Sequence, residues 1–216
     1  MKSKIISAVT ENKIIVISRG IKEKDLIPMA EAMYKGGIRL LEITYSADGS
    51  TSDEDTAHSI KMLCDHFGDR MHIGAGTVLT EKQVELTAAA GGKFIISPDT
   101  SEAVIKKTVE LGLVSMPGAL TPTEIQTAHR YGADFVKLFP VCTLGPEYVK
   151  AVKAPLSHIK LLAVGGVDTD NIKSYMKAGA VGFGIGSNIV NKKLIEAGEF
   201  NAVTALAKKY VESIKD

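Results

Sequence analysis

One pattern recurs along the chain and limits its fold more than any other feature. A helix-like stretch ends at a glycine, and a short apolar segment follows at once. Glycine suits the left-handed backbone position just beyond a helix. The pattern is regular, because Gly92, Gly112 and Gly132 are evenly spaced. Short strand-plus-helix units of regular length indicate parallel strands joined by crossover helices.

Counting these units predicts eight strands and nine helices. The strands are expected near residues 14–18, 38–43, 72–76, 94–97, 113–116, 134–138, 160–164 and 181–185. The helices are expected near residues 23–35, 53–67, 81–90, 101–111, 122–131, 146–153, 169–178 and 199–214, with a further helix at 2–11 before the first strand. Thr80 and Asp168 are suitable N-caps for two of them.

Eight such units predict a (β/α)₈ TIM barrel that forms a single domain over residues 1–216. An open, doubly wound sheet is the alternative fold. No Gly-x-Gly-x-x-Gly motif follows the first strand, which argues against that alternative.

Composition excludes several classes of function. The chain has 216 residues, of which 45% are hydrophobic, so it can bury a sizeable core. Its net charge of +1 gives no electrostatic basis for binding nucleic acid or an anionic membrane. No apolar run approaches transmembrane length and no signal peptide is evident, so a cytoplasmic protein is expected. Cys64 and Cys142 form no metal or redox pattern and are expected to be inert packing residues.

Lys137 lies inside the apolar strand segment 134–140, which Pro140 ends. Burial of an ammonium group without a partner is costly and lowers its pKa. A neutral buried amine is what Schiff-base chemistry needs. The alternative is a lysine that extends out of the barrel end or pairs with an acid for packing alone.

The carboxyl ends of barrel strands form the active site in this fold. The charged residues at the predicted ends are Arg19, Glu42 and Lys137. All five histidines lie elsewhere, which leaves Glu42 as the one possible metal ligand, so no metal is expected.

Strand alternation allows Lys137 and Glu42 to enter one pocket. If Lys137 and Glu42 point into the barrel, Phe135 and Leu40 point inward as well. The alternate residues of each strand, such as Val136 and Leu41, then face the helices. An acid and an amine across a barrel mouth make a suitable base and nucleophile. The alternative is that Glu42 only neutralises Lys137.

Two glycine-rich turns predict a phosphate site. Gly165 and Gly166 follow the seventh strand, and Gly186 and Ser187 follow the eighth. Their backbone N–H groups can approach an anion closely, and barrels often bind phosphate at this place. The alternative is a pair of tight turns that need small residues.

Further candidate substrate-binding residues lie at other strand ends. Arg19 can pair with a substrate carboxylate or phosphate, or it can be an ordinary surface arginine. Thr77 offers a hydroxyl beside very small residues, or it only begins a helix. Pro98 and Phe139 complete the set.

Taken together, these segments resemble the 2-keto-3-deoxy-6-phosphogluconate (KDPG) aldolases, which also act on 4-hydroxy-2-oxoglutarate (KHG). The resemblance spans nearly the whole chain. It is carried, in chain order, by Leu-Glu-Ile-Thr at 41–44, Gly-Ala-Gly-Thr-Val at 74–78, Ile-Ser-Pro at 96–98, Met-Pro-Gly at 116–118, Lys-Leu-Phe-Pro at 137–140 and Gly-Gly at 165–166.

This resemblance implies a (β/α)₈ barrel, a homotrimer, and no metal or organic cofactor. It implies cleavage of KDPG, or of a related keto acid, to pyruvate and glyceraldehyde 3-phosphate, or to glyoxylate in the case of KHG. The residue roles that it implies are a Schiff-base lysine at Lys137, a general acid/base at Glu42, a pyruvate-pocket threonine at Thr77, and phosphate contacts at Gly165, Gly166 and Ser187.

The chain departs from the family pattern at two places. Many members carry an arginine where Ser46 stands here, and many carry a threonine at the position of Val164. Arg19 is expected to take over the contact with the pyruvyl carboxylate. The alternatives to an aldolase are a phosphate-binding isomerase or epimerase, and a non-catalytic ligand-binding barrel. The last of these predicts a solvated Lys137 with an ordinary pKa.

Overall fold

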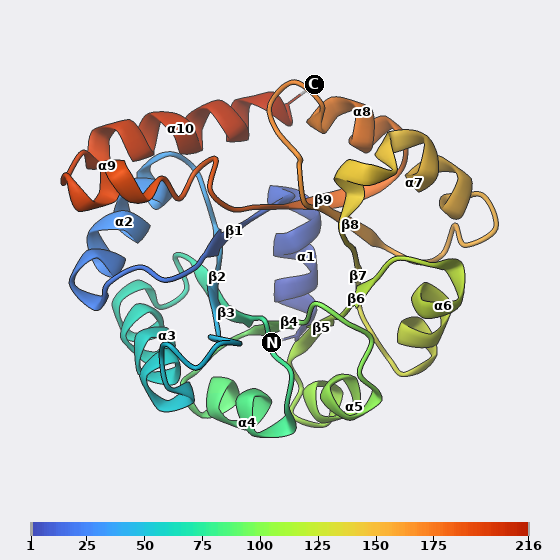
Figure 1. The fold of residues 1–216 in the computed structure, drawn as a ribbon, viewed down its shortest axis with the longest axis horizontal. Coiled ribbons are helices and arrows are strands. Elements are labelled where there is room, and N and C mark those ends of the chain that lie inside the picture. Colours follow the sequence, from blue (N-terminus) through green and yellow to red (C-terminus); the bar gives the residue numbers. More distant parts are fainter. Residues whose placement is uncertain (1, 216) are drawn as a thin grey trace.

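The computed structural model describes residues 2–215 and forms a ring of parallel strands with helices around it (Figure 1). The strands are β1 (Ile14–Ser18), β2 (Leu40–Thr44), β3 (His72–Gly76), β4 (Phe94–Ile96), β5 (Val114–Met116), β6 (Gly118–Ala119), β7 (Val136–Leu138), β8 (Leu161–Val164) and β9 (Ala180–Ile185). The helices are α1 (Lys2–Asn12), α2 (Glu23–Lys35), α3 (Asp53–Phe67), α4 (Glu81–Ala89), α5 (Glu102–Glu110), α6 (Pro122–Arg130), α7 (Gly145–Lys153), α8 (Ile172–Lys177), α9 (Lys192–Glu196) and α10 (Phe200–Ser213).

The strands are ordered β5-β4-β3-β2-β1-β9-β8-β7-β6, and every pair is parallel. β5 corresponds to the predicted fifth strand at 113–116. The two-residue β6 follows it beyond Pro117, which has no N–H to donate. The ring closes there, because the Lys137 N–H donates to the Pro117 carbonyl at 2.8 Å and the Phe135 N–H donates to the Ser115 carbonyl at 3.2 Å. The predicted (β/α)₈ barrel is confirmed, while the short strand β6 beyond Pro117 was not predicted.

The buried residues form two cores on opposite faces of the strands. The inner core contains Leu40 and Phe135, the alternate neighbours of Glu42 and Lys137. The outer core, between strands and helices, contains the residues next to them in sequence, such as Leu41 and Val136. The predicted alternation of both strands is therefore confirmed.

The first helix closes the amino-terminal end of the barrel. Figure 1 shows α1 across the centre of the ring, and its Ile5 and Val9 belong to the inner core. Lys2 forms an ion pair of 3.0 Å with Asp134, which stands just before β7. The carboxyl ends of the strands are thus left as the mouth of the barrel.

At the other end of the chain, α10 packs against α2 and completes the outer ring (Figure 1). The Thr204 hydroxyl donates to the Ala32 carbonyl at 3.0 Å. A Cβ at Gly36 would come within 2.5 Å of the Ala207 Cβ, so the close approach of the two helices needs glycine at this point.

Some local predictions are confirmed and others are wrong. Thr80 caps α4 in a capping box with Gln83. Asp168 does not cap α8, which begins at Ile172 rather than at 169, because the Asp168 carboxylate accepts the N–H groups of two residues in the turn before the helix. The helix α9 and the short 3₁₀ helix Val141–Thr143 were not predicted.

Both cysteines are free thiols. Cys64 is half-buried, as a packing residue is, whereas Cys142 is exposed, so the predicted packing role is wrong for Cys142. Within residues 2–215, no helix has the length and apolar character needed to cross a bilayer.

Replacing Ile5 with alanine should test whether α1 closes the amino-terminal end of the barrel. Ile5 is buried in the inner core, so we expect the free energy of unfolding to fall by roughly 2–5 kcal/mol in urea titrations. Ser7→Ala, on the exposed face of the same helix, should change it by less than about 0.5 kcal/mol. Equal effects of the two variants would show that α1 does not close the core.

Candidate active site

Lys137 and Glu42 meet inside the mouth of the barrel. They are buried to 8% and 2% exposure, on β7 and β2. Both line a space of ≈ 10 Å³, bounded also by Ile17, Val164 and Gly184. That is roughly the room that one water molecule needs. The two groups predicted as nucleophile and base therefore share one pocket.

Burial shifts the pKa values of both groups. Burial raises the pKa of Glu42 to about 7, although the positive charges of Lys137 and Arg19 act in the opposite direction. Burial lowers the pKa of Lys137, and the positive charge of Arg19 adds to this effect while Glu42 opposes it. The two shifts together favour a neutral amine on Lys137 and a Glu42 carboxyl group that exchanges its proton near neutral pH.

Gly76 makes room for the Glu42 side chain. A Cβ at Gly76 would overlap the Glu42 carboxylate. Glycine inside a strand often marks a close approach of this kind. Among the described residues, Glu42 Oε2 has no hydrogen-bond partner although it is buried. This oxygen is therefore available to a substrate hydroxyl or to a water molecule in the pocket.

Arg19 and Thr77 are joined above the pocket. The Arg19 guanidinium donates a hydrogen bond of 3.0 Å to the Thr77 hydroxyl. Thr77 has a φ of 54°, which a β-branched residue rarely adopts, and such strain clusters at functional sites. The neighbouring loop after β2 holds no arginine, and Ser46 bonds instead to Asp48 and Ser50.

Phe139 stands over the nucleophile at the rim. The Lys137 Nζ lies 4.8 Å from the centre of the Phe139 ring, and 39% of the Phe139 surface is exposed. A Cβ at Gly165 would come within 3.3 Å of the same ring. Phe139 therefore forms an apolar wall between the amine and the glycine-rich turn after β8.

The two glycine-rich turns border a common cavity of ≈ 320 Å³. Gly165, Gly166, Gly186 and Ser187 line it, and Val164 forms its inner wall. Gly165 and Gly166 have φ values of 94° and 77°, a region that L side chains rarely adopt. This cavity shares Val164 and Gly184 with the Lys137 pocket, so the two spaces are neighbours.

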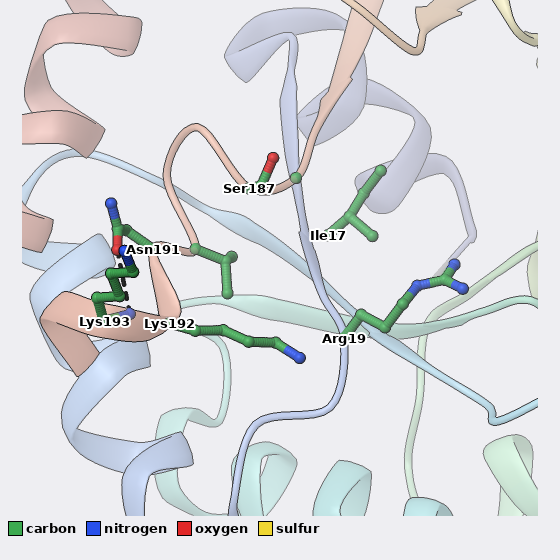
Figure 2. Close-up of a pocket in the computed structure, with 8 residues that line it drawn as sticks. Ile17, Arg19, Ser187, Asn191, Lys192 and Lys193 are labelled. Atoms are coloured by element: carbon green, nitrogen blue, oxygen red, sulfur yellow. Dashed lines mark hydrogen bonds between the residues drawn. The ribbon is translucent and has the colours of Figure 1, made fainter. Parts of the chain in front are cut away.

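A larger cavity of ≈ 620 Å³ lies on the other side of Ser187 (Figure 2). Arg19 reaches it from the loop after β1, and Lys192 reaches it from the first residue of α9. Ile17 lines it from β1. Sequence patterns alone did not single out Ile17 or Lys192. Strand alternation from Arg19 places Ile17 inside the barrel, whereas no local signal predicts the direction of Lys192.

One predicted substrate-binding residue lies apart from these spaces. Pro98, after β4, lines none of the three cavities, and its carbonyl group packs so closely on Gly118 that a Cβ there would overlap it. Among residues 2–215, no three His, Cys, Asp or Glu side chains lie close enough to share a metal ion.

Comparisons with known proteins point to one family. The family model described as KDPG and KHG aldolase matches residues 5–206. The 2-dehydro-3-deoxy-6-phosphogalactonate aldolase of Escherichia coli strain K12 is 34% identical over 207 residues, which cover 95% of this chain and 98% of that protein. The 2-dehydro-3-deoxy-phosphogluconate aldolase of Haemophilus influenzae is 29% identical and is matched over 98% of this chain and 97% of that protein.

The fold is also that of a solved family member. The crystal structure of KDPG aldolase from Legionella pneumophila, with pyruvate captured at low pH as a covalent carbinolamine intermediate, matches with a TM-score of 0.84 at 27% identity. The match covers 94% of this chain and 96% of that one. The chain therefore belongs to the KDPG and KHG aldolase family.

Proposed function

We propose that the chain is a class I aldolase, a carbon–carbon lyase, whose Schiff base forms on Lys137. The observation that carries this proposal is the burial of Lys137 beside Glu42, with the pKa of the lysine lowered. Covalent capture of pyruvate by the Legionella pneumophila relative supports it. A non-catalytic barrel predicts a solvated lysine, which is not what the structure has.

The first half of the reaction cleaves the substrate. The neutral amine of Lys137 attacks the C2 ketone of a 2-keto-3-deoxy acid, and loss of water leaves a positively charged iminium. Glu42, as a carboxylate, takes the proton of the C4 hydroxyl, directly or through one water in the pocket. The C3–C4 bond then breaks, its electron pair moves to the iminium, and the aldehyde leaves.

The second half returns the enzyme to its starting state. The enamine left on Lys137 is protonated at C3 by Glu42, which now acts as an acid. Water then adds to the iminium carbon and releases pyruvate and the free amine. A pKa of about 7 allows Glu42 to act in both directions near neutral pH.

Two anion contacts would hold the substrate in this position. Arg19 and Thr77 would receive the C1 carboxylate, which is bound to the carbon that Lys137 attacks. The turns at Gly165, Gly166 and Ser187 would receive the phosphate at the other end. No cofactor takes part, because the electron sink is the iminium on Lys137. The homotrimer and the cytoplasmic location expected from the sequence stay predictions.

We further propose that the substrate is the galactonate epimer, 2-keto-3-deoxy-6-phosphogalactonate, rather than KDPG. These two acids differ in configuration at C4. Val164 forms the wall between the Lys137 pocket and the glycine-rich cavity, where a valine offers a substrate hydroxyl no hydrogen bond. The name of the Escherichia coli relative at 34% identity supports this choice.

Borohydride trapping with pyruvate should test the assignment of Lys137. We expect peptide mass spectrometry to find the reduced pyruvyl adduct on Lys137, and Lys137→Met and Lys137→Arg to lose both adduct and turnover, since arginine keeps the charge but is no nucleophile. Lys160→Met is the matched control, at the opposite end of the barrel. Substantial aldol cleavage by Lys137→Met would contradict the mechanism.

The role of Glu42 should appear in a pH profile. Only ionised Glu42 accepts a proton, so the rate of deuterium exchange into the pyruvate methyl group should rise as pH rises and level off above about 7. Pyruvate carries no phosphate that titrates in this range. Glu42→Gln should lower the rate about 10²–10⁴-fold and lose this dependence. A rate constant that is flat from pH 5 to 8 would argue against Glu42 as the base.

Steady-state kinetics with the two C4 epimers should test the substrate. We expect kcat/KM to be higher for the phosphogalactonate, and Val164→Thr to shift the ratio toward KDPG by about tenfold, since one hydroxyl contact contributes about 1.4 kcal/mol. Val164→Ala removes the same wall without adding a hydroxyl and serves as the control. An isomerase would convert either acid without releasing pyruvate.

A further inference from the structure

The proposed phosphate site has no positive side chain of its own. The cavity of ≈ 320 Å³ bordered by the two glycine-rich turns is lined by ten residues, none of which carries a charge. A phosphate monoester carries a charge of about −1.5 to −2 near pH 7. Backbone N–H groups and the Ser187 hydroxyl can bond its oxygens, but they leave most of this charge unbalanced.

Three positively charged side chains, those of Arg19, Lys192 and Lys193, line the adjoining cavity of ≈ 620 Å³. This cavity shares Ile17, Gly186 and Ser187 with the uncharged one, so the two are neighbours. A Cβ at Gly186 would meet nothing within 4 Å, which means that the passage beside Ser187 is open. An anion seated at Ser187 is therefore accessible from the cationic side.

Lys192 is a cation of this cavity whose ammonium is free to serve such an anion. Its side chain extends into the cavity toward the β1 loop (Figure 2), and its Nζ lies 3.1 Å from where a Cβ of Gly20 would be. Within residues 2–215, the Lys192 ammonium has no hydrogen bond or ion pair. Arg19 lines the same cavity, but its guanidinium is turned away from Lys192 and bonded to Thr77.

Lys193 provides an internal comparison. It is exposed, as Lys192 is, lines the same cavity and is its neighbour in sequence. Figure 2 shows its side chain beside Asn191, on the far side from Arg19, and its backbone N–H is bonded to the Asn191 side chain. The two lysines thus carry the same charge at nearly the same place but point in different directions.

We propose that Lys192 determines specificity for a phosphorylated substrate tail, by pairing its ammonium with the phosphate held at Gly186 and Ser187. This inference rests on the proposed aldolase function and deepens it. The ordinary alternative is a solvated lysine that happens to border a cavity, for which a neutral substitution changes nothing.

Steady-state kinetics of Lys192→Gln and Lys193→Gln should separate the two possibilities. We expect Lys192→Gln to raise KM for the phosphorylated substrate about tenfold at low ionic strength, with kcat nearly unchanged, because a charge-assisted contact is lost. Lys192→Arg should restore most of the affinity. The difference in KM between Lys192→Gln and the wild type should shrink at high salt, since the pair of ammonium and phosphate is exposed to solvent. Lys193→Gln should behave like the wild type.

Trapping of pyruvate, which has no tail, separates this proposal from the proposed function. Lys192→Gln should form the borohydride-reduced adduct at the wild-type rate. If the wild type forms the adduct while Lys192→Gln and Lys193→Gln have equal KM values, the role of Lys192 is wrong and the aldolase stands. If the wild type forms no adduct, the aldolase is wrong.

Binding of inorganic phosphate tests Lys192 without any turnover. We expect phosphate to raise the melting temperature of the wild type and of Lys193→Gln. Lys192→Gln should need a phosphate concentration about tenfold higher for the same rise. An equal response from all three proteins would overturn the proposal, whether or not the chain is an aldolase.

Discussion

The desolvation of Lys137 beside Glu42 is the constraint on which the rest of the site depends. An isolated buried charge is unfavourable, so each group moves toward its neutral form, and each charge partly stabilises the other. This balance requires a dry pocket. The barrel provides such a pocket because α1 closes its amino-terminal end and because Gly76 lets the Glu42 carboxylate lie close against β3. A solvated lysine at the same strand end would stay protonated and would not react.

Around this pair, two positively charged side chains of the proposed substrate site point in different directions. The Arg19 guanidinium is bonded to Thr77 and turned away from Lys192, although both residues line one cavity with Ser187. In the proposed site, a substrate with a carboxylate at one end and a phosphate at the other would bind in one orientation, with its ketone at Lys137. Orientation of this kind converts binding energy into rate, because the reacting atoms are held at the distance that the reaction needs.

The fold and the reacting pair were predictable from sequence because both depend on periodic patterns. Repeating units gave the barrel, and strand alternation placed Glu42 and Lys137 in one pocket. The features that were missed have no such period. The two-residue strand β6 lies beyond Pro117, which has no N–H to donate, and the five-residue helix α9 is too short to show an apolar stripe. Neither the left-handed backbone of Thr77 nor the direction of the Lys192 side chain follows from a periodic pattern in the sequence.

The contrast between the inward-facing pair, which the sequence predicts, and the loop features, which it does not, has a physical basis in the barrel. Residues inside the ring share one closely packed core, so a change there disturbs the burial that the chemistry needs. Residues on the loops after β2, β8 and β9 border open cavities, and substitutions there change contacts with the substrate at little cost to the core. Ser46 lies in such a loop, Lys192 begins the helix α9 that follows one, and Val164 lies at the end of β8 beside one. The proposed Schiff-base chemistry is therefore compatible with changes in the preferred aldehyde tail.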